Sequence, residues 1–272
     1  MRTFSATTTG ELCCAPADPQ GDASKGIQLL ALPSAEAVAR YAANAVLEAA
    51  LGNPGRPLGL ATGRTMVPVY AALAGFVRAL PASRQDSLRR HWCSFNLDEY
   101  VGLGPETAGS FAAEMAHNLG GPLGLDPRQM HLPNGLAPDP AAEASRYAAA
   151  LHRLGGAGLQ LLGLGLNGHV GFNEPPCGPE SRARCVTLCP TTRQANAGAF
   201  GGDPGQVPIQ AMTLGMADIL EAEHILLVVT GAAKAPILQR LIHSPPTPEV
   251  PASWLHHHPS VVVVADPEAL RP

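Results

Sequence analysis

Short apolar segments alternate along this chain with segments whose apolar residues recur at helical spacing. The first apolar run, 27–32, is typical of a buried strand. A pattern with one apolar face follows it, in which Ser34 is a candidate N-cap and Glu36 lies in the first turn. The other strands predicted in this way are 57–61, 92–97, 159–164, 224–230 and 260–265. A second helix is predicted to begin after Thr65 as its N-cap, with Pro68 in its first turn. Further helices are predicted over 107–118, 140–154 and 232–243.

Strand and helix in this order predict an α/β fold, Rossmann-like and doubly wound, with a mostly parallel sheet and helices on both of its faces. The nearly all-apolar run 159–164 agrees, because a strand covered on both faces has no side that meets water. Ligands of such sheets bind outside the carboxyl ends of the strands, near the point where the strand order reverses. A functional site is therefore expected in the loops that follow the strands.

Length and composition are those of a packed globular protein. The chain has 272 residues, 46% hydrophobic and 15% charged, which predicts a single α/β domain over 27–272. Residues 1–26 lack the apolar core of a secretory signal and predict a flexible leader. No apolar run is long enough to span a membrane, so we expect a cytoplasmic protein with reduced thiols and no membrane partner.

Charge and residue spacing argue against nucleic acid and against a metal. Lys plus Arg number 18 and Asp plus Glu number 22, so the net charge of -4 leaves no basic footprint for nucleic acid. A small anionic substrate remains compatible, because a few well-placed cations suffice for one phosphate. Cys185 and Cys189, and the histidines at 256–258, lack the usual spacing of a zinc site, so no metal is expected.

The loop after the second predicted strand has the residues of a phosphate site. Gly63 lets the backbone approach a ligand, the start of the next helix offers free N–H groups, and Thr62 and Thr65 add hydroxyls beside the cation Arg64. The loop matches neither of the Gly-rich nucleotide fingerprints. A tight turn followed by an N-cap would account for the same residues.

Two adjacent acids, Asp98 and Glu99, follow the third predicted strand. Neighbouring side chains of an extended segment point in opposite directions, so at most one of these acids faces a given site. A carboxylate there could act as a general base, and a surface acid or a helix cap is the alternative.

The loop after the fourth predicted strand is the most specific of the three. It is rich in glycine and contains His169, the residue type best suited to proton transfer near neutral pH. Asn167 and Glu174 lie near enough in sequence to orient the ring. Further along, Arg193 and Lys234 are candidate cations for a phosphate, although each by itself is typical of a surface charge.

These loops together resemble those of the glucosamine-6-phosphate deaminase family, which is related to the 6-phosphogluconolactonases. The resemblance covers roughly 27–265 and is carried by LGLATGRT, FNLDEYVGL and above all GLGLNGHVGFNEP. It implies the sugar-phosphate isomerase/deaminase fold, no cofactor, and a small-molecule amino-sugar phosphate as partner. The family contains both monomers and hexamers, so a homo-oligomer is compatible with the resemblance.

The resemblance implies that glucosamine 6-phosphate and water are converted to fructose 6-phosphate and ammonium. Asp98 would be the base that moves a proton from C2 to C1, and His169 would help to open the pyranose ring. Glu174 and Asn167 would hold His169 in its tautomer and charge state. The phosphate would be bound by one loop and two distant cations: Thr62, Gly63, Arg64, Thr65, Arg193 and Lys234.

The chain departs from the family pattern at two positions. Many members have Asp where this chain has Asn167, and Asn adds no negative charge, so His169 should be less readily protonated here. A second Gly or a Ser is usual where Arg64 stands, which would strengthen phosphate binding or change the sugar that is accepted. The Pro-, Gly- and Cys-rich stretch 175–205 corresponds to the segment that the family uses as a lid.

Three other functions stay open at this point. A 6-phosphogluconolactonase-type hydrolase shares the fold, but the FNEP element favours the deaminases. A non-catalytic sugar-phosphate-sensing domain normally follows a helix-turn-helix, for which the leader is too short. Galactosamine 6-phosphate differs from glucosamine 6-phosphate in the configuration of one hydroxyl, which no motif distinguishes.

Overall fold

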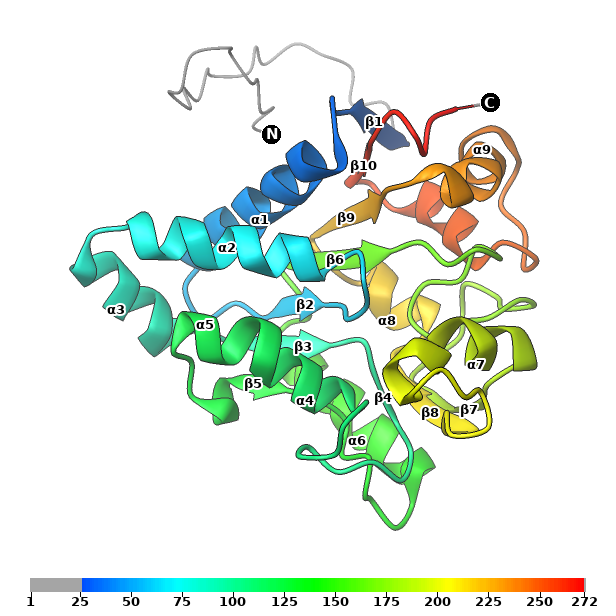
Figure 1. The fold of residues 1–272 in the computed structure, drawn as a ribbon, viewed down its shortest axis with the longest axis horizontal. Coiled ribbons are helices and arrows are strands. Elements are labelled where there is room, and N and C mark those ends of the chain that lie inside the picture. The colour runs from blue at the N-terminus through cyan, green and yellow to red at the C-terminus, as the bar shows by residue number, and fades with distance from the viewer. Residues whose placement is uncertain (1–25, 272) are drawn as a thin grey trace.

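A central sheet organises the computed structural model, which describes residues 26–271. The predicted leader, 1–26, therefore lies outside the described residues except for its last one. The strands of this sheet are β1 (Ile27–Ala31), β2 (Leu58–Leu60), β3 (Ser94–Asn96), β5 (Met130–His131), β6 (Leu159–Gly163), β9 (His224–Val229) and β10 (Val261–Ala265). All seven run parallel, in the order β1-β10-β9-β6-β2-β3-β5 (Figure 1).

Helices cover both faces of this sheet, which confirms the predicted doubly wound α/β fold. They are α1 (Ala35–Gly52), α2 (Val67–Ala79), α3 (Ala82–His91), α4 (Phe111–Met115), α5 (Gly121–Leu123), α6 (Pro140–Arg153), α7 (Pro190–Asn196), α8 (Met216–Leu220) and α9 (Ala235–His243). Figure 1 shows α1, α2 and α5 on the near side of the sheet and α8 on its far side. Among the residues from 26 to 271, no helix combines the length and apolarity that a membrane span needs.

The middle of the core is formed by β6, β9 and β10. Leu161, Leu227 and Val263, one from each strand, are completely buried. Their strands pair in parallel register, and helices on both faces remove water from both sides. This is why the segments read as continuous apolar runs in the sequence.

Two of the expected helix starts differ in the structure. Ser34 caps α1 as expected, since its hydroxyl accepts from the N–H of Ala37 at 3.1 Å. The expectation that Thr65 caps α2 is wrong: the helix is preceded by Met66 and has no side-chain cap, although Pro68 does lie in its first turn. The helix expected over 107–118 begins only at α4, because a turn comes first and Ser110 then accepts from the N–H of Ala113.

A second, three-stranded sheet is absent from the sequence expectations. Its strands are β4 (Asp98–Tyr100), β7 (Arg184–Thr187) and β8 (Gln210–Thr213), antiparallel in the order β4-β8-β7. The chain passes from one sheet to the other at Leu97, whose N–H donates to Leu60 and whose carbonyl accepts from Leu214. The segment after β3, expected to be a loop, is therefore a strand.

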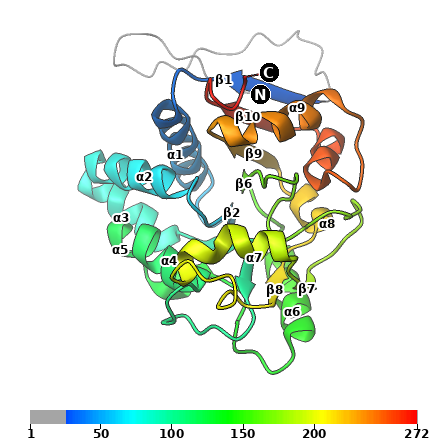
Figure 2. The ribbon, with the colours of Figure 1, turned by 45° about the vertical axis from the view of Figure 1, so that its right-hand side comes forward.

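The stretch 175–205, expected to be a lid, contains β7, α7 and the 3-10 turn Ala197–Phe200. Figure 2 shows α7 in front of the strands of the small sheet. It rests on an aromatic cluster around Tyr100: the rings of Tyr100 and Phe200 lie edge to face with centroids 5.5 Å apart. The amide of Asn196 also donates to the Tyr100 hydroxyl at 3.0 Å. The stretch is thus a folded unit docked on β4.

Candidate active site

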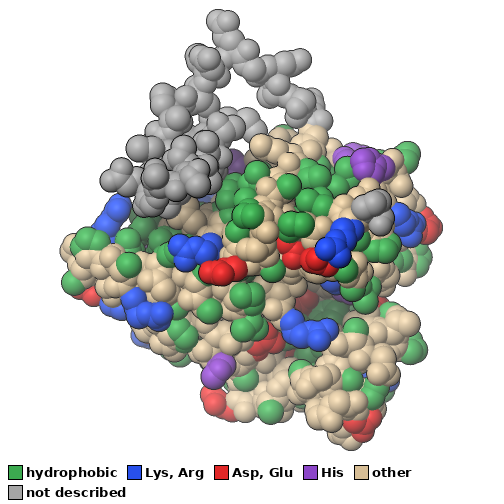
Figure 3. Space-filling model, turned by 45° about the horizontal axis from the view of Figure 1, so that its top comes forward, with side chains coloured by type: hydrophobic (Ala, Val, Ile, Leu, Met, Phe, Trp, Pro, Cys, Tyr) green, Lys and Arg blue, Asp and Glu red, His purple; other side chains and the backbone are tan. Residues whose placement is uncertain are grey.

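The strand order reverses between β2 and β6. From β2 the chain adds β3 and β5 on one side, and then crosses to β6 and adds β9 and β10 on the other. The loops after β2 and β6 therefore leave the same edge of the sheet side by side, which is where doubly wound sheets bind ligands. The face seen in Figure 3 is hollowed, and both basic and acidic side chains lie at the rim of the hollow.

The loop after β2 turns at Gly63. The φ angle of Gly63 is 101°, a left-handed value that a residue with a Cβ rarely adopts, and a Cβ added there would meet no atom within 4 Å. The N–H of Met66 donates to the Gly63 carbonyl at 2.8 Å and closes the turn. The N–H of Gly63 donates to Oε1 of Glu114 at 2.9 Å. An anion from α4 thus occupies a backbone donor of the predicted phosphate loop.

Asp98 is buried at the start of β4, with 5% of its surface exposed. A Cβ added to Gly171 would lie 3.3 Å from Oδ2 of Asp98, so the carboxylate faces the loop that follows β6. Burial raises the pKa of Asp98 well above its ordinary range, and the nearby charges of Glu99 and Glu114 raise it further. The carboxylate is therefore a stronger base than a solvated one.

Glu99 points the other way, as the alternation along a strand predicts. It is 1% exposed, and its carboxylate accepts from the N–H groups of Tyr100, Phe111 and Ala112 at 2.8–3.0 Å. Two of these are free donors at the start of α4, so Glu99 stabilises that helix end. Of the two adjacent acids, Asp98 faces the site and Glu99 has the structural role.

His169 is held by a residue two positions earlier in the same loop. Its Nδ1 lies 2.6 Å from Oδ1 of Asn167, and the amide oxygen can only accept, so Nδ1 carries the proton. Burial lowers the pKa of His169 to about 4; the charge of Glu174 acts in the opposite direction, and that of Lys234 lowers it further. The ring is therefore neutral near pH 7 and has its lone pair on Nε2. The expectation that Asn167 makes His169 less readily protonated than Asp would remains a prediction, because the low pKa found here is caused mainly by burial.

Gly165 makes room for this ring. A Cβ at Gly165 would lie 2.3 Å from Cε1 of His169, which is closer than any real Cβ contact. The N–H of Gly165 also donates to the His169 carbonyl at 2.9 Å, which closes the loop on itself. The absence of a side chain at Gly165 is thus a packing requirement of the histidine.

Glu174 contacts a residue that the sequence reasoning did not select. Its Oε2 accepts from the N–H of Cys189 at 3.0 Å, and its Oε1 lies 3.1 Å from Sγ of the same residue. Its influence on His169 is electrostatic, through the pKa of the ring. Cys189 stands at the N-cap of α7, so Glu174 also ties the docked stretch to the loop after β6.

The predicted phosphate cations occupy two different places. Lys234 follows β9, and its pKa is lowered by burial and by the charge of Arg64, which places these two cations near each other. The guanidinium of Arg193 donates to the carbonyls of Val207 at 3.1 Å and Gly205 at 3.3 Å, both close to its own element. The fold thus brings Lys234 to the loop after β2, whereas Arg193 is held by the backbone near α7.

The fold is that of a doubly wound α/β enzyme, with acidic and basic side chains gathered at the carboxyl edge of its parallel sheet. The family model of glucosamine-6-phosphate isomerases/6-phosphogluconolactonase matches residues 33–264. The chain belongs to this family.

Individual relatives agree with this assignment. The chain is 40% identical over 244 residues to a glucosamine-6-phosphate deaminase of Geobacillus sp. (strain WCH70), with 90% of this chain and 95% of the relative covered. It is 41% identical over 243 residues to a glucosamine-6-phosphate deaminase of Rhodopirellula baltica, with 89% and 94% covered.

Solved structures share the fold. A monomeric glucosamine-6-phosphate deaminase superposes with a TM-score of 0.83 at 35% identity, over 90% of this chain and all of that one. A 6-phosphogluconolactonase from Trypanosoma cruzi superposes with a TM-score of 0.71 at 17% identity, over 90% of this chain and 96% of that one. The second likeness concerns the fold alone.

Proposed function

We propose that this protein is an amino-sugar phosphate deaminase that converts glucosamine 6-phosphate and water to fructose 6-phosphate and ammonium. The observation that carries the proposal is the pair of acid–base groups at the switch point. The buried Asp98 carboxylate faces the loop in which Asn167 orients a neutral His169. Aldose–ketose isomerisation needs two such groups, one at the reacting carbons and one at the ring oxygen.

Ring opening is assigned to His169. Its Nε2 lone pair accepts the proton of the C1 hydroxyl while the bond between C1 and the ring oxygen breaks, and His169 then passes that proton to the ring oxygen. The product is the open-chain aldehyde. The low pKa of His169, about 4, suits this step, because the ring enters it unprotonated near pH 7.

Proton transfer between carbons is assigned to Asp98. Its carboxylate takes the C2 proton of the open chain while a proton from the substrate's ammonium group moves to the aldehyde oxygen, which gives an enolamine, and it then returns the C2 proton to C1. The bond between C2 and nitrogen becomes an iminium, to which water adds. Ammonium then leaves and C2 becomes the ketone of fructose 6-phosphate. Burial of Asp98 makes the carboxylate a better match to a weakly acidic C–H bond.

The phosphate is assigned to the loop after β2, with Thr62, Gly63, Arg64 and Thr65, and to the cation Lys234. Arg193 joins this set in the proposal once it leaves its present backbone acceptors. A dianionic group held far from the reacting carbons supplies binding energy that orients C1 and C2 toward Asp98. We further propose a cytoplasmic location, which the free thiols of Cys93, Cys177, Cys185 and Cys189 support.

An ammonium-release assay tests the proposal. Wild-type protein is offered glucosamine 6-phosphate and galactosamine 6-phosphate, and 6-phosphogluconolactone serves as the substrate of the lactonase alternative. We expect ammonium from glucosamine 6-phosphate and little lactone hydrolysis. Asp98→Asn should lower kcat by at least about 100-fold, the usual contribution of a general base. Asp86→Asn, on the exposed face of α3, is the matched control. Absence of ammonium from both amino sugars would refute the function, and full activity of Asp98→Asn would refute only the role of that residue.

A further inference from the structure

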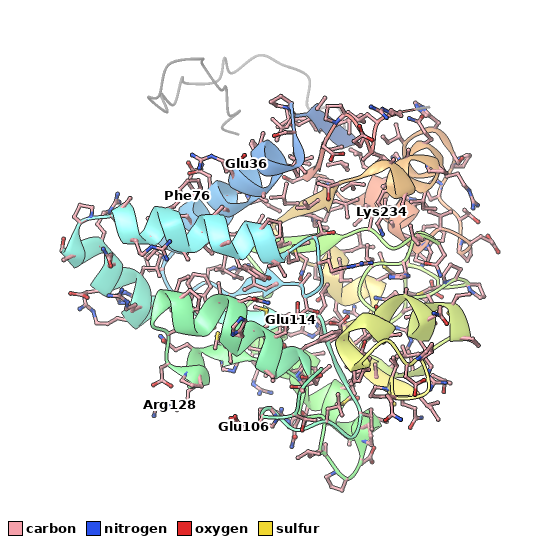
Figure 4. The ribbon with its side chains drawn as sticks, viewed as in Figure 1. Glu36, Phe76, Glu106, Glu114, Arg128 and Lys234 are labelled. Carbon is pink, nitrogen blue, oxygen red and sulfur yellow. The ribbon has the colours of Figure 1, made fainter. Side chains whose placement is uncertain are left out.

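A carboxylate lies where the proposed phosphate is expected. Oε1 of Glu114 accepts from the N–H of Gly63 at 2.9 Å, across 51 positions of sequence. That N–H belongs to the turn whose hydroxyls and amides make the loop a phosphate site. Figure 4 shows Glu114 on α4 near the end of β2 and Lys234 beyond the end of β9, whereas Glu106 lies on an outer loop.

The fold holds Glu114 in this position through the helix that carries it. Ser110 caps α4, and Glu99 accepts from the N–H groups of Phe111 and Ala112 at the same helix end. The charge of Glu114 is felt by Asp98 and by Tyr100, whose pKa values it helps to raise. Glu114 is therefore an anchored charge at the site.

This charge acts against a phosphate on two counts. One amide hydrogen cannot form a full hydrogen bond to two anions at once. A phosphate that accepts from the Gly63 N–H must therefore displace the Glu114 carboxylate. A dianion in the loop would also lie within a few ångströms of that carboxylate, at a separation where like charges near a protein surface repel by kilocalories per mole. Arg64 and Lys234 are the cations that offset this repulsion.

We propose that Glu114 is a specificity-determining residue that selects against simple phosphates at the loop after β2. In the free protein its carboxylate occupies the Gly63 amide, so a phosphate binds well only when the attached sugar makes contacts that compensate for displacing it. Inorganic phosphate, which has no sugar, is thereby kept out. The inference rests on the proposed function in one respect only, that this loop receives the phosphate.

The test separates charge from support of the loop. Glu114→Gln keeps an oxygen that accepts from the Gly63 N–H and removes the charge, and Glu114→Ala removes both. Glu106→Gln removes an exposed acid from the outer loop and is the matched control. Binding of inorganic phosphate is measured by titration calorimetry, and kcat and KM are measured for glucosamine 6-phosphate.

We expect both Glu114 variants to bind inorganic phosphate at least about fivefold more tightly than wild type, given the repulsion that they relieve. The KM of Glu114→Gln should fall, and Glu106→Gln should match wild type in both kinetics and phosphate binding. A residue that merely supports the loop would give the opposite result, namely weaker phosphate binding in Glu114→Ala. Weaker phosphate binding in Glu114→Ala would overturn the inference. So would an unchanged affinity in both Glu114 variants, or the absence of phosphate binding to wild type and to every variant. Because phosphate binding is measured without turnover, tighter binding in a protein that releases no ammonium would sustain this inference while the proposed function fails.

Discussion

His169 shows how one neighbouring residue sets the chemistry of another. An amide oxygen accepts from Nδ1 and contributes no charge, and burial then lowers the pKa of the ring to about 4. A carboxylate in the same place would favour the imidazolium. At this scale the Asn167 amide fixes the proton on Nδ1, and burial keeps the ring neutral near pH 7.

Asn167→Asp should therefore raise the pKa of His169 from about 4 toward or above the ordinary value of about 6.5. The reason is the new negative charge beside Nδ1. The measurement is an NMR titration of the ring Cε1–H signal of His169. An unchanged midpoint would contradict the electrostatic account of this pair.

Cys189 offers a second test at the residue scale. Its thiol and its backbone N–H both contact Glu174, so the side chain helps to orient that carboxylate. Cys189→Ser keeps a donor and should retain kcat, whereas Cys189→Ala should lower it by about 2–10-fold, the usual value of one hydrogen bond. Cys93→Ala, at the opposite end of β3, is the control. The measurement is kcat from steady-state kinetics. Equal kcat of the Ala and Ser variants would exclude a role for the thiol.

At the scale of elements, the small sheet and α7 form a unit that rests on the larger sheet. The ring of Tyr100 of β4 contacts those of Phe111, Phe172 and Phe200 in tilted or edge-to-face arrangements. These rings join β4, α4, the loop after β6 and the end of the docked stretch. Glu174 and Cys189 tie the same unit to the site. Since this unit packs on a small apolar cluster that is separate from the main core, its docking should be weaker than that of the core helices.

Phe200→Ala should loosen this unit without unfolding the molecule. It removes one ring from the cluster, and large-to-small changes of aromatic rings cost about 3–5 kcal/mol when the ring is fully buried and less for the partly buried Phe200. We expect faster amide hydrogen exchange over 190–207 and unchanged exchange in β9. Uniform acceleration across both regions would show that α7 is instead part of the core.

On the scale of the whole molecule, burial of a carboxylate at the site lowers the stability of the folded state near neutral pH. Asp98 is buried without an ion pair among the contacts found for residues 26–271, and its raised pKa means that the folded state binds a proton more tightly than the unfolded chain does. Stability from this group is present at low pH and is lost as pH rises from about 3.9 through the folded-state pKa. His169 acts in the opposite sense, because its folded pKa of about 4 removes stability as pH falls from about 6.5.

Asp98→Asn should consequently be inactive and yet more stable than wild type at pH 7–8. The variant removes a buried charge and keeps the shape of the side chain. Its midpoint of thermal unfolding should rise by about 2–4 °C per kcal/mol gained. The gain should shrink toward pH 4, where the wild-type carboxyl is protonated. A lower melting temperature at pH 8 would contradict the role of burial in raising the pKa of Asp98.

What the sequence by itself determined are the features that depend on neighbours along the chain. Strands β6, β9 and β10 read as apolar runs because both of their faces are covered, whereas the two-residue β5 has no such signal and was not predicted. Helices α1, α6 and α9 show helical spacing with caps or first-turn prolines. The opposite directions of Asp98 and Glu99 follow from strand geometry, and the contact of Asn167 with His169 spans two residues. Motifs in these segments indicated the family.

The tertiary structure alone decided the contacts between distant segments. Asp98 faces the loop after β6, Glu114 takes the amide of Gly63, and Cys189 contacts Glu174 only because separate elements dock at one edge of the sheet. Glu114 has no motif that marks it, since its partner is 51 positions away. The energy of such a contact depends on how whole elements pack, and local patterns of polarity do not contain that information.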